Sequence, residues 1–231
     1  YNTTMKPIYI ILIIITISLT FSSVRFFVLV QKTKVIIKNT TPFQKTNPGA
    51  TMRILALGDS TMVGTGAKDN NNSTAGRLSS LYPEASLENI SKNGMRITEL
   101  NEKIKNIENK YDLIVIQIGA NDIIRFTSNK TIDSELDKLL TKTKSLSDKV
   151  IILHSGDVGE TKMFPLFIKP FYSKKSKQVR EIYITQTKKH NADYVDLFDT
   201  HTKDEFYAND FLHLNDDGYE VWYEKIKEKL D

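Results

Sequence analysis

The sequence predicts an α/β fold with three layers, in which a parallel β-sheet lies between two layers of helices. Two observations support this prediction. From Met52 onward, short apolar segments alternate with segments of helical periodicity. One apolar segment, 113–118, has a polar side chain only at Gln117, as is typical of strands buried on both faces of a parallel sheet. Strands joined by helices in this way form a right-handed, parallel arrangement.

The individual elements follow from the pattern of apolar residues. The predicted strands cover residues 53–57, 86–90, 113–118, 150–153 and 194–197. The predicted helices cover residues 74–82, 97–107, 132–146 and 173–189. In the second of them, apolar side chains recur at three- and four-residue spacing from Ile97 to Ile107. A last helix follows Asn215 or Asp216, either of which can cap its first turn.

The N-terminal segment predicts a transmembrane helix. Residues 8–24 carry no charge, and a helix of this length measures about 26 Å, close to the ~30 Å hydrocarbon core of a bilayer. Arg25 can reach the interface, and residues 26–30 can lengthen the span. A cleaved secretory leader is the alternative, although no Ala-x-Ala-like cleavage site follows. We expect residues 1–30 to be a single-pass membrane anchor.

Residues 31–51 are rich in Thr, Lys, Asn and Pro and predict a polar tether, which leaves one domain over residues 52–231. Because the tether shows no helical or strand periodicity, we expect the domain to fold and act without residues 1–50. The flanking basic residues, taken alone, favour a cytoplasmic domain. An N-terminal leader of this kind more often exports the chain behind it, and we therefore expect the domain on the extracytoplasmic side.

Composition excludes several kinds of site. The chain has no cysteine, which excludes disulfides, thiolate catalysis and cysteine-based metal centres. The net charge of +4 is too small to predict nucleic-acid binding. Basic residues nevertheless gather in the region of the fourth helix, and both a solvated helix face and contact with an anionic membrane surface fit them. They are Lys169, Lys174, Lys175, Lys177, Arg180, Lys188 and Lys189.

A serine follows the first predicted strand, where open α/β sheets place their reactive groups. Gly58 and Asp59 precede Ser60, and a glycine-containing stretch then lets the backbone turn sharply. Ser60 supplies a hydroxyl nucleophile. Hydrolysis of an ester through such a serine also needs a base, a group that orients the base, and hydrogen-bond donors for the oxyanion.

Three later segments offer these groups. His213 is the candidate base, because Asp210 three residues earlier can accept a hydrogen bond from its other ring nitrogen. Gly94 follows the second strand and can donate its backbone N–H, and Asn121 follows the third strand and can donate its side-chain amide. The remaining histidines have no comparably placed acid, and we interpret them as structural or exposed: His154, His190 and His201.

The same segments resemble the four sequence blocks of the Ser-Gly-Asn-His (GDSL-type) esterases and lipases. The blocks are Gly-Asp-Ser at 58–60, Gly94, Gly-x-Asn-Asp at 119–122 and Asp-x-x-His at 210–213, and the likeness covers residues 52–231. The resemblance implies a flavodoxin-like, five-stranded sheet and an ester substrate, with no metal or other cofactor.

The resemblance also implies a role for each residue. Ser60 would be the nucleophile and His213 the base, oriented by Asp210. The oxyanion hole would combine the N–H groups of Ser60 and Gly94 with the Asn121 side chain. Two positions depart from the family pattern: Phe211 stands where glycine is common, and Leu214 where proline is usual.

Other functions fit the sequence less well. A metal-dependent hydrolase could use Asp199, His201, Asp210 and His213, but their spacing matches no defined metal site. The glycine-containing turn after the first strand lacks the lysine of a nucleotide-binding loop. A catalytically inactive, glycan- or lipid-binding relative is a further alternative. For an enzyme, the candidate substrates are lysophospholipids, O-acetylated glycans and small soluble esters, and the anchor favours a lipid or envelope ester.

Overall fold

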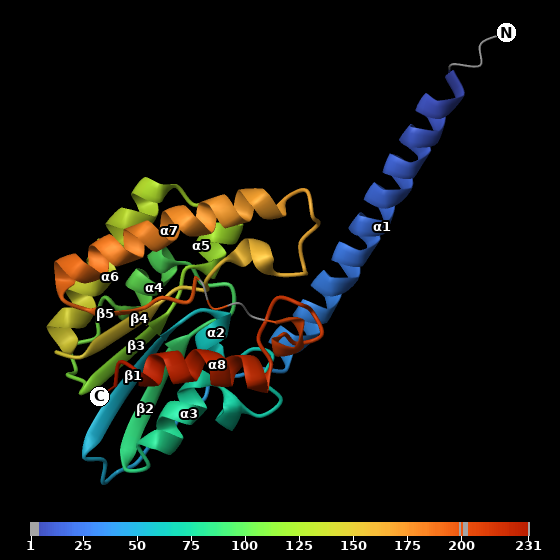
Figure 1. The fold of residues 1–231 in the computed structure, drawn as a ribbon. Helices are drawn as coiled ribbons and strands as arrows, with labels where there is room; N and C mark the ends of the chain where they lie inside the picture. Colours follow the sequence, from blue (N-terminus) through green and yellow to red (C-terminus); the bar gives the residue numbers. More distant parts are fainter. Residues whose placement is uncertain (1–4, 199, 201–202, 231) are drawn as a thin grey trace.

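The computed structural model describes residues 5–198, 200 and 203–230, and it contains one five-stranded parallel sheet. The strands lie in the order β2-β1-β3-β4-β5 (Figure 1). Their bounds are β1 (Met52–Gly58), β2 (Ala85–Ser91), β3 (Leu113–Gln117), β4 (Val150–Leu153) and β5 (Asp193–Val195). Every pairing in the sheet is parallel, which confirms the predicted fold class.

Helices cover both faces of the sheet, because each central strand is apolar on both sides. Leu55 and Leu57 of β1 contribute to one apolar cluster, and Ile54 and Ala56 contribute to the other. The first cluster lies under α4 (Ile97–Ile104), α6 (Asn129–Leu146) and α7 (Lys169–His190). The second lies under α3 (Thr74–Leu81) and α8 (Asp216–Lys227).

The carboxyl ends of β1 and β3 meet at the point where the strand order changes direction. The chain moves outward from β1 to β2 on one side and from β3 to β4 on the other. The short helices α2 (Ser60–Val63) and α5 (Ala120–Ile124) begin directly after these two strands. Open parallel sheets bind their ligands in the crevice at such a position. Short 3-10 helices complete the loops: η1 (Asn70–Asn72), η2 (Val158–Glu160) and η3 (Asp204–Phe206).

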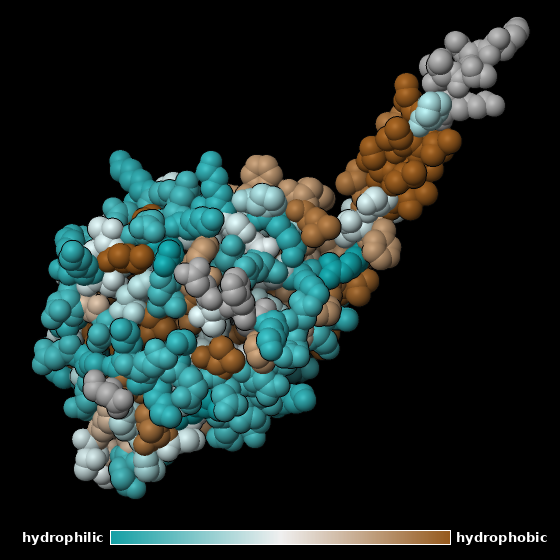
Figure 2. Space-filling view, in the orientation of Figure 1, coloured by the Kyte–Doolittle hydropathy of each residue, from teal (hydrophilic) through white to brown (hydrophobic). Residues whose placement is uncertain are grey.

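The N-terminal helix α1 (Met5–Lys38) projects away from the domain over its first turns (Figure 1). Among the described residues it is the helix long and apolar enough to cross a membrane, with a mean hydropathy of 2.2 over its most apolar 18 residues. Its projecting part is hydrophobic over its surface (Figure 2). Such a helix is compatible with a single-pass anchor or a signal sequence.

The prediction of a polar tether from residue 31 is wrong for residues 31–38, which continue α1 as far as Lys38. The last turns of α1 pack on the domain, where Leu29 is buried and Phe26 and Val30 lie against the core. Buried apolar contacts of this kind stabilise a helix that its polar residues alone would not indicate. The chain beyond α1 is also held, because Lys45 forms an antiparallel bridge with Leu87 of β2.

Helix α7 differs from its prediction in extent and in the environment of its lysines. It begins at Lys169, four residues before the predicted start, with Pro170 in its first turn, where proline is favoured. Lys175 is buried and donates to the Thr127 carbonyl oxygen. The helix runs from the side of α1 to the far side of the domain (Figure 1). Because Lys175 is buried, it is not part of an exposed basic surface.

Candidate active site

Ser60 is the first residue of α2, at the carboxyl end of β1. The turn before it needs glycine, because a Cβ on Gly58 would lie 2.0 Å from the Gln117 carbonyl oxygen of the neighbouring strand. The Asp59 side chain caps α2 by accepting a hydrogen bond from the Thr61 N–H at 3.0 Å. As the first helical residue, Ser60 has an N–H with no acceptor inside the helix.

His213 and Asp210 form a hydrogen-bonded pair in the loop before α8. The distance from His213 Nδ1 to Asp210 Oδ2 is 2.7 Å, and Asp210 Oδ1 accepts from the backbone N–H groups of Leu212 and His213 at 3.0 and 3.1 Å. Burial alone would raise the pKa of the Asp210 carboxyl, but these hydrogen bonds, with His213 first, hold it below its ordinary value.

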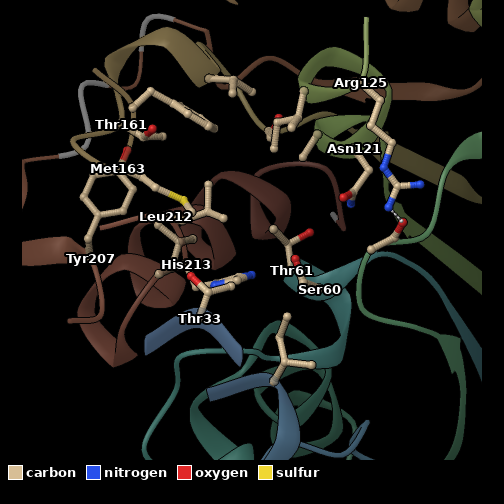
Figure 3. A pocket seen from close by; sticks show the side chains of 18 of the residues that line it. Thr33, Ser60, Thr61, Asn121, Arg125, Thr161, Met163, Tyr207, Leu212 and His213 are labelled. Carbon is tan, nitrogen blue, oxygen red and sulfur yellow. Dashed lines mark hydrogen bonds between the residues drawn. The ribbon is translucent and has the colours of Figure 1, made fainter. Parts of the chain in front are cut away.

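The ionised Asp210 determines which nitrogen of His213 carries the proton. A carboxylate only accepts hydrogen bonds, so Nδ1 is the donor and Nε2 of the neutral ring is an acceptor. Figure 3 shows the His213 ring directed toward Ser60. The pair therefore leaves Nε2 as a hydrogen-bond acceptor on the side of Ser60.

The loop that carries His213 packs directly on the turn that follows Ser60. A Cβ on Gly66 would lie 2.2 Å from the Leu214 carbonyl oxygen, so glycine is required for this close approach. The Tyr219 hydroxyl of α8 donates to the Thr65 carbonyl oxygen at 2.9 Å. Together these contacts set the separation between the candidate base and the candidate nucleophile. Helix α8 is itself capped by Asn215, one of the two predicted caps, and Asp216 is its first helical residue.

Gly94 and Asn121 reach the same pocket from the ends of β2 and β3. Gly94 has a φ of 77°, which favours glycine, and its carbonyl oxygen accepts from Arg125 Nη2 at 3.2 Å (Figure 3, dashed line). Asn121 lies in the first turn of α5, with its Nδ2 3.5 Å from Asp59 Oδ2. Both residues line the pocket with Ser60 and His213, so the five predicted residues come together around one pocket, with Asp210 behind His213.

Asp59 is a further buried acid beside Ser60. Burial raises the pKa of its carboxyl to about 6, against the smaller opposing effects of Thr61, His213 and Asn121. Asp59 therefore keeps its proton to a higher pH than an exposed carboxyl would, although it does not line the pocket.

The pocket has a volume of about 370 Å³ and two chemically different sides. One side is apolar and includes Met163 and Leu212, whereas Asn121 and Arg125 lie on the other side (Figure 3). Further apolar side chains of the lining come from α1 and from the chain around η2. They are Phe26, Ile37, Val158 and Phe164.

The other described histidines do not line the pocket. His154 is buried, and desolvation lowers the pKa of its ring to about 4; its Nδ1 lies 3.1 Å from the Tyr194 hydroxyl. His190 pairs with Asp137 at the end of α7. Asp199 and His201 lie outside the described residues, so the alternative metal site is not tested. Within the described part of the chain, no group of three potential ligands could hold a metal ion.

The sequence profile of the GDSL-like lipase/acylhydrolase family matches residues 56–221, a range that includes every candidate site residue. The chain belongs to this family. No curated protein matches the sequence.

Solved structures share the fold of this GDSL-family chain at low sequence identity. A lipolytic G-D-S-L protein from Veillonella parvula matches with a TM-score of 0.64 and 17% identity, over 78% of this chain and 98% of its own. Phospholipase A1 from Streptomyces albidoflavus matches with a TM-score of 0.63 and 15% identity, over 78% and 100%. An acetyl xylan esterase from Geobacillus stearothermophilus matches with a TM-score of 0.59 and 19% identity, over 78% and 95%.

The structure accounts for one of the two departures from the GDSL pattern. Phe211 has a φ of 56°, the left-handed region that glycine occupies most easily, so the loop keeps a glycine-like backbone with a phenylalanine side chain. That side chain lies against the core and beneath the Arg25 guanidinium. Leu214 is buried and lies opposite Tyr207 in a short antiparallel bridge. The hydrogen bonds of this bridge are made by the backbone groups of Ala208, His213, Phe206 and Asn215. Because they do not use the N–H of Leu214, they do not explain why proline is absent there.

One contact of this site involves a residue that the sequence did not indicate. Thr33 of α1 donates its hydroxyl to Asp210 Oδ2 at 2.9 Å. Thr33 lies in the segment interpreted as a tether. The signal that could have indicated it is the spacing of Phe26, Leu29 and Val30 before it and Ile37 after it, which continues a helical face beyond the apolar run.

Proposed function

We propose that this GDSL-family chain is a serine hydrolase that cleaves carboxylic esters through an acyl-enzyme intermediate. The observation that supports this proposal best is the hydrogen bond between His213 Nδ1 and Asp210, together with the direction of the His213 ring toward Ser60 (Figure 3). Ser60 Oγ attacks the ester carbonyl carbon while His213 Nε2 takes its proton. The developing oxyanion accepts hydrogen bonds from the N–H groups of Ser60 and Gly94 and from Asn121 Nδ2.

Collapse of the tetrahedral intermediate breaks the bond to the alcohol, which leaves with the proton held by His213. A water molecule then gives a proton to His213 and attacks the acyl carbon. Collapse of this second tetrahedral intermediate breaks the bond to Ser60 Oγ, which takes the proton back from His213, and the carboxylic acid departs. The chain itself supplies every catalytic group that these steps require, and none of the steps needs a metal.

The pocket supports a lipid ester over an O-acetylated glycan as the substrate. Its apolar side, with Met163, Phe164 and Leu212, suits an acyl chain, since apolar burial contributes about 0.8 kcal/mol per methylene. Arg125 on the opposite side suits an anionic group on the alcohol part, as in a lysophospholipid.

The nucleophile is tested with a fluorophosphonate probe on the full-length chain. The probe is expected to label the wild type and not Ser60→Ala. Equal labelling of both would contradict the assignment, and no labelling of a folded wild type would favour an inactive, ligand-binding relative.

The substrate class is tested with p-nitrophenyl esters of increasing acyl length. We expect kcat/KM to rise with chain length, and activity to persist in EDTA. A preference for acetate would instead favour an O-acetyl glycan.

A further inference from the structure

The helix that carries the apolar N-terminal segment ends against the candidate catalytic acid. Thr33 Oγ1 donates to Asp210 Oδ2 at 2.9 Å, across 177 residues of sequence. One residue earlier, Lys32 Nζ donates to the Asn209 carbonyl oxygen at 3.3 Å. We infer that Thr33 is a positioning residue for Asp210, which makes α1 part of the active site as well as a membrane helix. This inference rests on the proposed serine-hydrolase function.

The carboxylate of Asp210 is held at both oxygens. Oδ1 accepts two backbone N–H groups of its own loop, and Oδ2 accepts His213 Nδ1 and the Thr33 hydroxyl. Asp210 is completely buried, so loss of the Thr33 hydroxyl would leave a charged oxygen with one partner fewer and little access to water. Thr33 therefore restricts the rotation of the carboxylate that orients the imidazole.

The hydroxyl of Thr33 has a different kind of partner from the hydroxyls of other threonines in α1 or just after it. Thr16, Thr20 and Thr40 donate to the carbonyl oxygen four residues earlier, as threonine commonly does in a helix. Thr33 donates to the domain instead. Leu29, which is buried one turn earlier, fixes the face of α1 that presents this hydroxyl.

The test uses the full-length chain in detergent with a soluble p-nitrophenyl ester. Thr33→Val removes the hydroxyl and keeps the shape, and we expect kcat to fall about tenfold, as for a hydrogen bond to a charged group, with little change in KM. Thr33→Ser is expected to keep most of the activity. Thr40→Val is the matched control, because Thr40 follows the end of α1 and its hydroxyl donates only to the Ile36 carbonyl oxygen in the last turn of that helix.

A double-mutant cycle separates positioning from a general effect on folding. In an Asp210→Ala background the acceptor is gone, so Thr33→Val is expected to change the residual kcat less than twofold. A full tenfold loss in that background, or wild-type activity in Thr33→Val, would overturn the role of Thr33. Equal activity of wild type and Ser60→Ala would instead overturn the proposed function itself.

An independent observation is an apolar surface beside α1. Leu166, Phe167 and Phe171 have 82%, 64% and 64% of their surface exposed, in the loop before α7 and its first turn. Figure 2 shows hydrophobic side chains at the junction of α1 and the domain, next to the hydrophobic projecting part of the helix. Exposed aromatic and aliphatic groups gathered in this way mark an interaction surface. We call these three residues the loop patch.

The loop patch lies close to the level at which α1 would leave a bilayer. Residues 7–24 are uncharged and measure about 27 Å as a helix, close to the thickness of the hydrocarbon core. Phe26 therefore lies near the membrane–water interface, and its ring centroid is 6.3 Å from that of Phe164, two residues before Leu166.

Cations accompany the loop patch at this level. Lys169 begins α7 between Phe167 and Phe171 in the sequence, and its Nζ donates to the Glu160 carbonyl oxygen at 3.4 Å. Arg25 is the first charged residue after the uncharged run of α1. Aromatic side chains flanked by basic residues suit the headgroup region, where cations meet lipid phosphates. We propose that the loop patch inserts into the leaflet from which α1 emerges, next to the apolar side of the pocket.

The absence of cysteine makes a single-site label possible. Phe167→Cys, labelled with bimane in the full-length chain and reconstituted in phosphatidylcholine–phosphatidylglycerol vesicles, is expected to show blue-shifted emission. Lipids with a nitroxide near the headgroup are expected to quench it. Lys105→Cys, at the exposed end of α4, is the control and is expected to remain unquenched. Equal emission and quenching at the two sites would overturn the insertion, whatever the outcome for catalysis.

Discussion

His213 is the residue on which the proposed proton transfer depends. Its ring is tied to Asp210 at Nδ1 and lines the pocket with Ser60. We expect His213→Ala to abolish ester turnover, and Asp210→Asn to be less severe because the two backbone N–H groups and the loop still hold the ring nearby. His190→Ala is the control, since His190 pairs with Asp137 at the end of α7. Full activity in His213→Ala, measured as kcat/KM, would show that another base acts.

Asn121 is expected to act on the transition state rather than on substrate binding. Its amide lies just after β3 and lines the same pocket as Ser60, which follows β1. Removal of one oxyanion donor typically costs about 10²–10³ in kcat, so Asn121→Ala is expected to show a loss of that size with KM little changed. Circular dichroism checks that the variant is folded. If kcat of the folded variant falls by less than about threefold, the Asn121 amide makes only its contact with Asp59 and does not stabilise the oxyanion.

Asp59 should make stability depend on pH in a definite direction. Because burial raises the pKa of its carboxyl from 3.8 to about 6, the folded protein keeps a proton that the unfolded chain loses between these pH values. The contribution of Asp59 to the free energy of unfolding is therefore full below this window and falls as pH rises through it, by about 3 kcal/mol in all.

The variant Asp59→Asn cannot titrate, and its thermal midpoint is expected to fall less between pH 4 and pH 6 than that of the wild type. Trp222 is the single tryptophan and reports unfolding by fluorescence. Asp217→Asn, at an exposed acid of α8, serves as the control. Parallel curves for wild type and Asp59→Asn would show that Asp59 has an ordinary pKa.

At the scale of elements, local patterns predict the sheet and most of the helices. The apolar runs at 113–118 and 150–153 become β3 and β4 within a residue of their predicted ends. The predicted starts of helices are less accurate than those of strands. Helix α7 begins at Lys169 and not at the predicted Ser173, because its first turn contains Pro170, which favours a helix start but adds nothing to the apolar spacing. Ser60, Gly94 and Asn121 could be placed together because they follow strands, and the carboxyl ends of parallel strands share one edge. Asp210 and His213 follow no strand directly, and their spacing indicated them instead.

The continuation of α1 is indicated only by the spacing of its few apolar residues, and composition points the other way. Gln31, Lys32 and Lys34 give the segment after residue 30 a polar composition. The contacts that keep it helical, the burial of Leu29 and the bond from Thr33, involve parts of the chain far away in sequence. Such contacts become visible only when the fold is known, and they assign to the site a residue that composition had placed in a linker.

At the scale of the whole molecule, we expect the N-terminal helix to export the chain behind it, which would put the domain on the extracytoplasmic side of the membrane. We expect protease added to intact cells to degrade the domain and leave α1 in the membrane, whereas a cytoplasmic reporter protein stays intact. Protection of the domain until the cells are permeabilised would place it inside, as the basic residues after Val24 favour.

Removal of N-terminal residues tests how α1 and the domain depend on each other. The sequence led us to expect an active domain without residues 1–50, but that truncation removes the buried Leu29 and the Thr33 hydroxyl bonded to Asp210. Loss of one buried apolar side chain costs about 1.5–3 kcal/mol, so the truncated domain should be less stable. It should also be about tenfold slower on a soluble ester, as expected for the lost hydrogen bond.

Removal of residues 1–24 is the matched comparison, because it deletes the projecting apolar part of α1 and leaves Phe26, Leu29 and Thr33 in place. We expect this shorter truncation to match the full-length chain in kcat/KM on a soluble ester. It should lose activity only on substrates presented in vesicles, because the domain is no longer held at their surface. Equal activity of the two truncations on the soluble ester, with both folded, would show that the last turns of α1 do not contribute to the site.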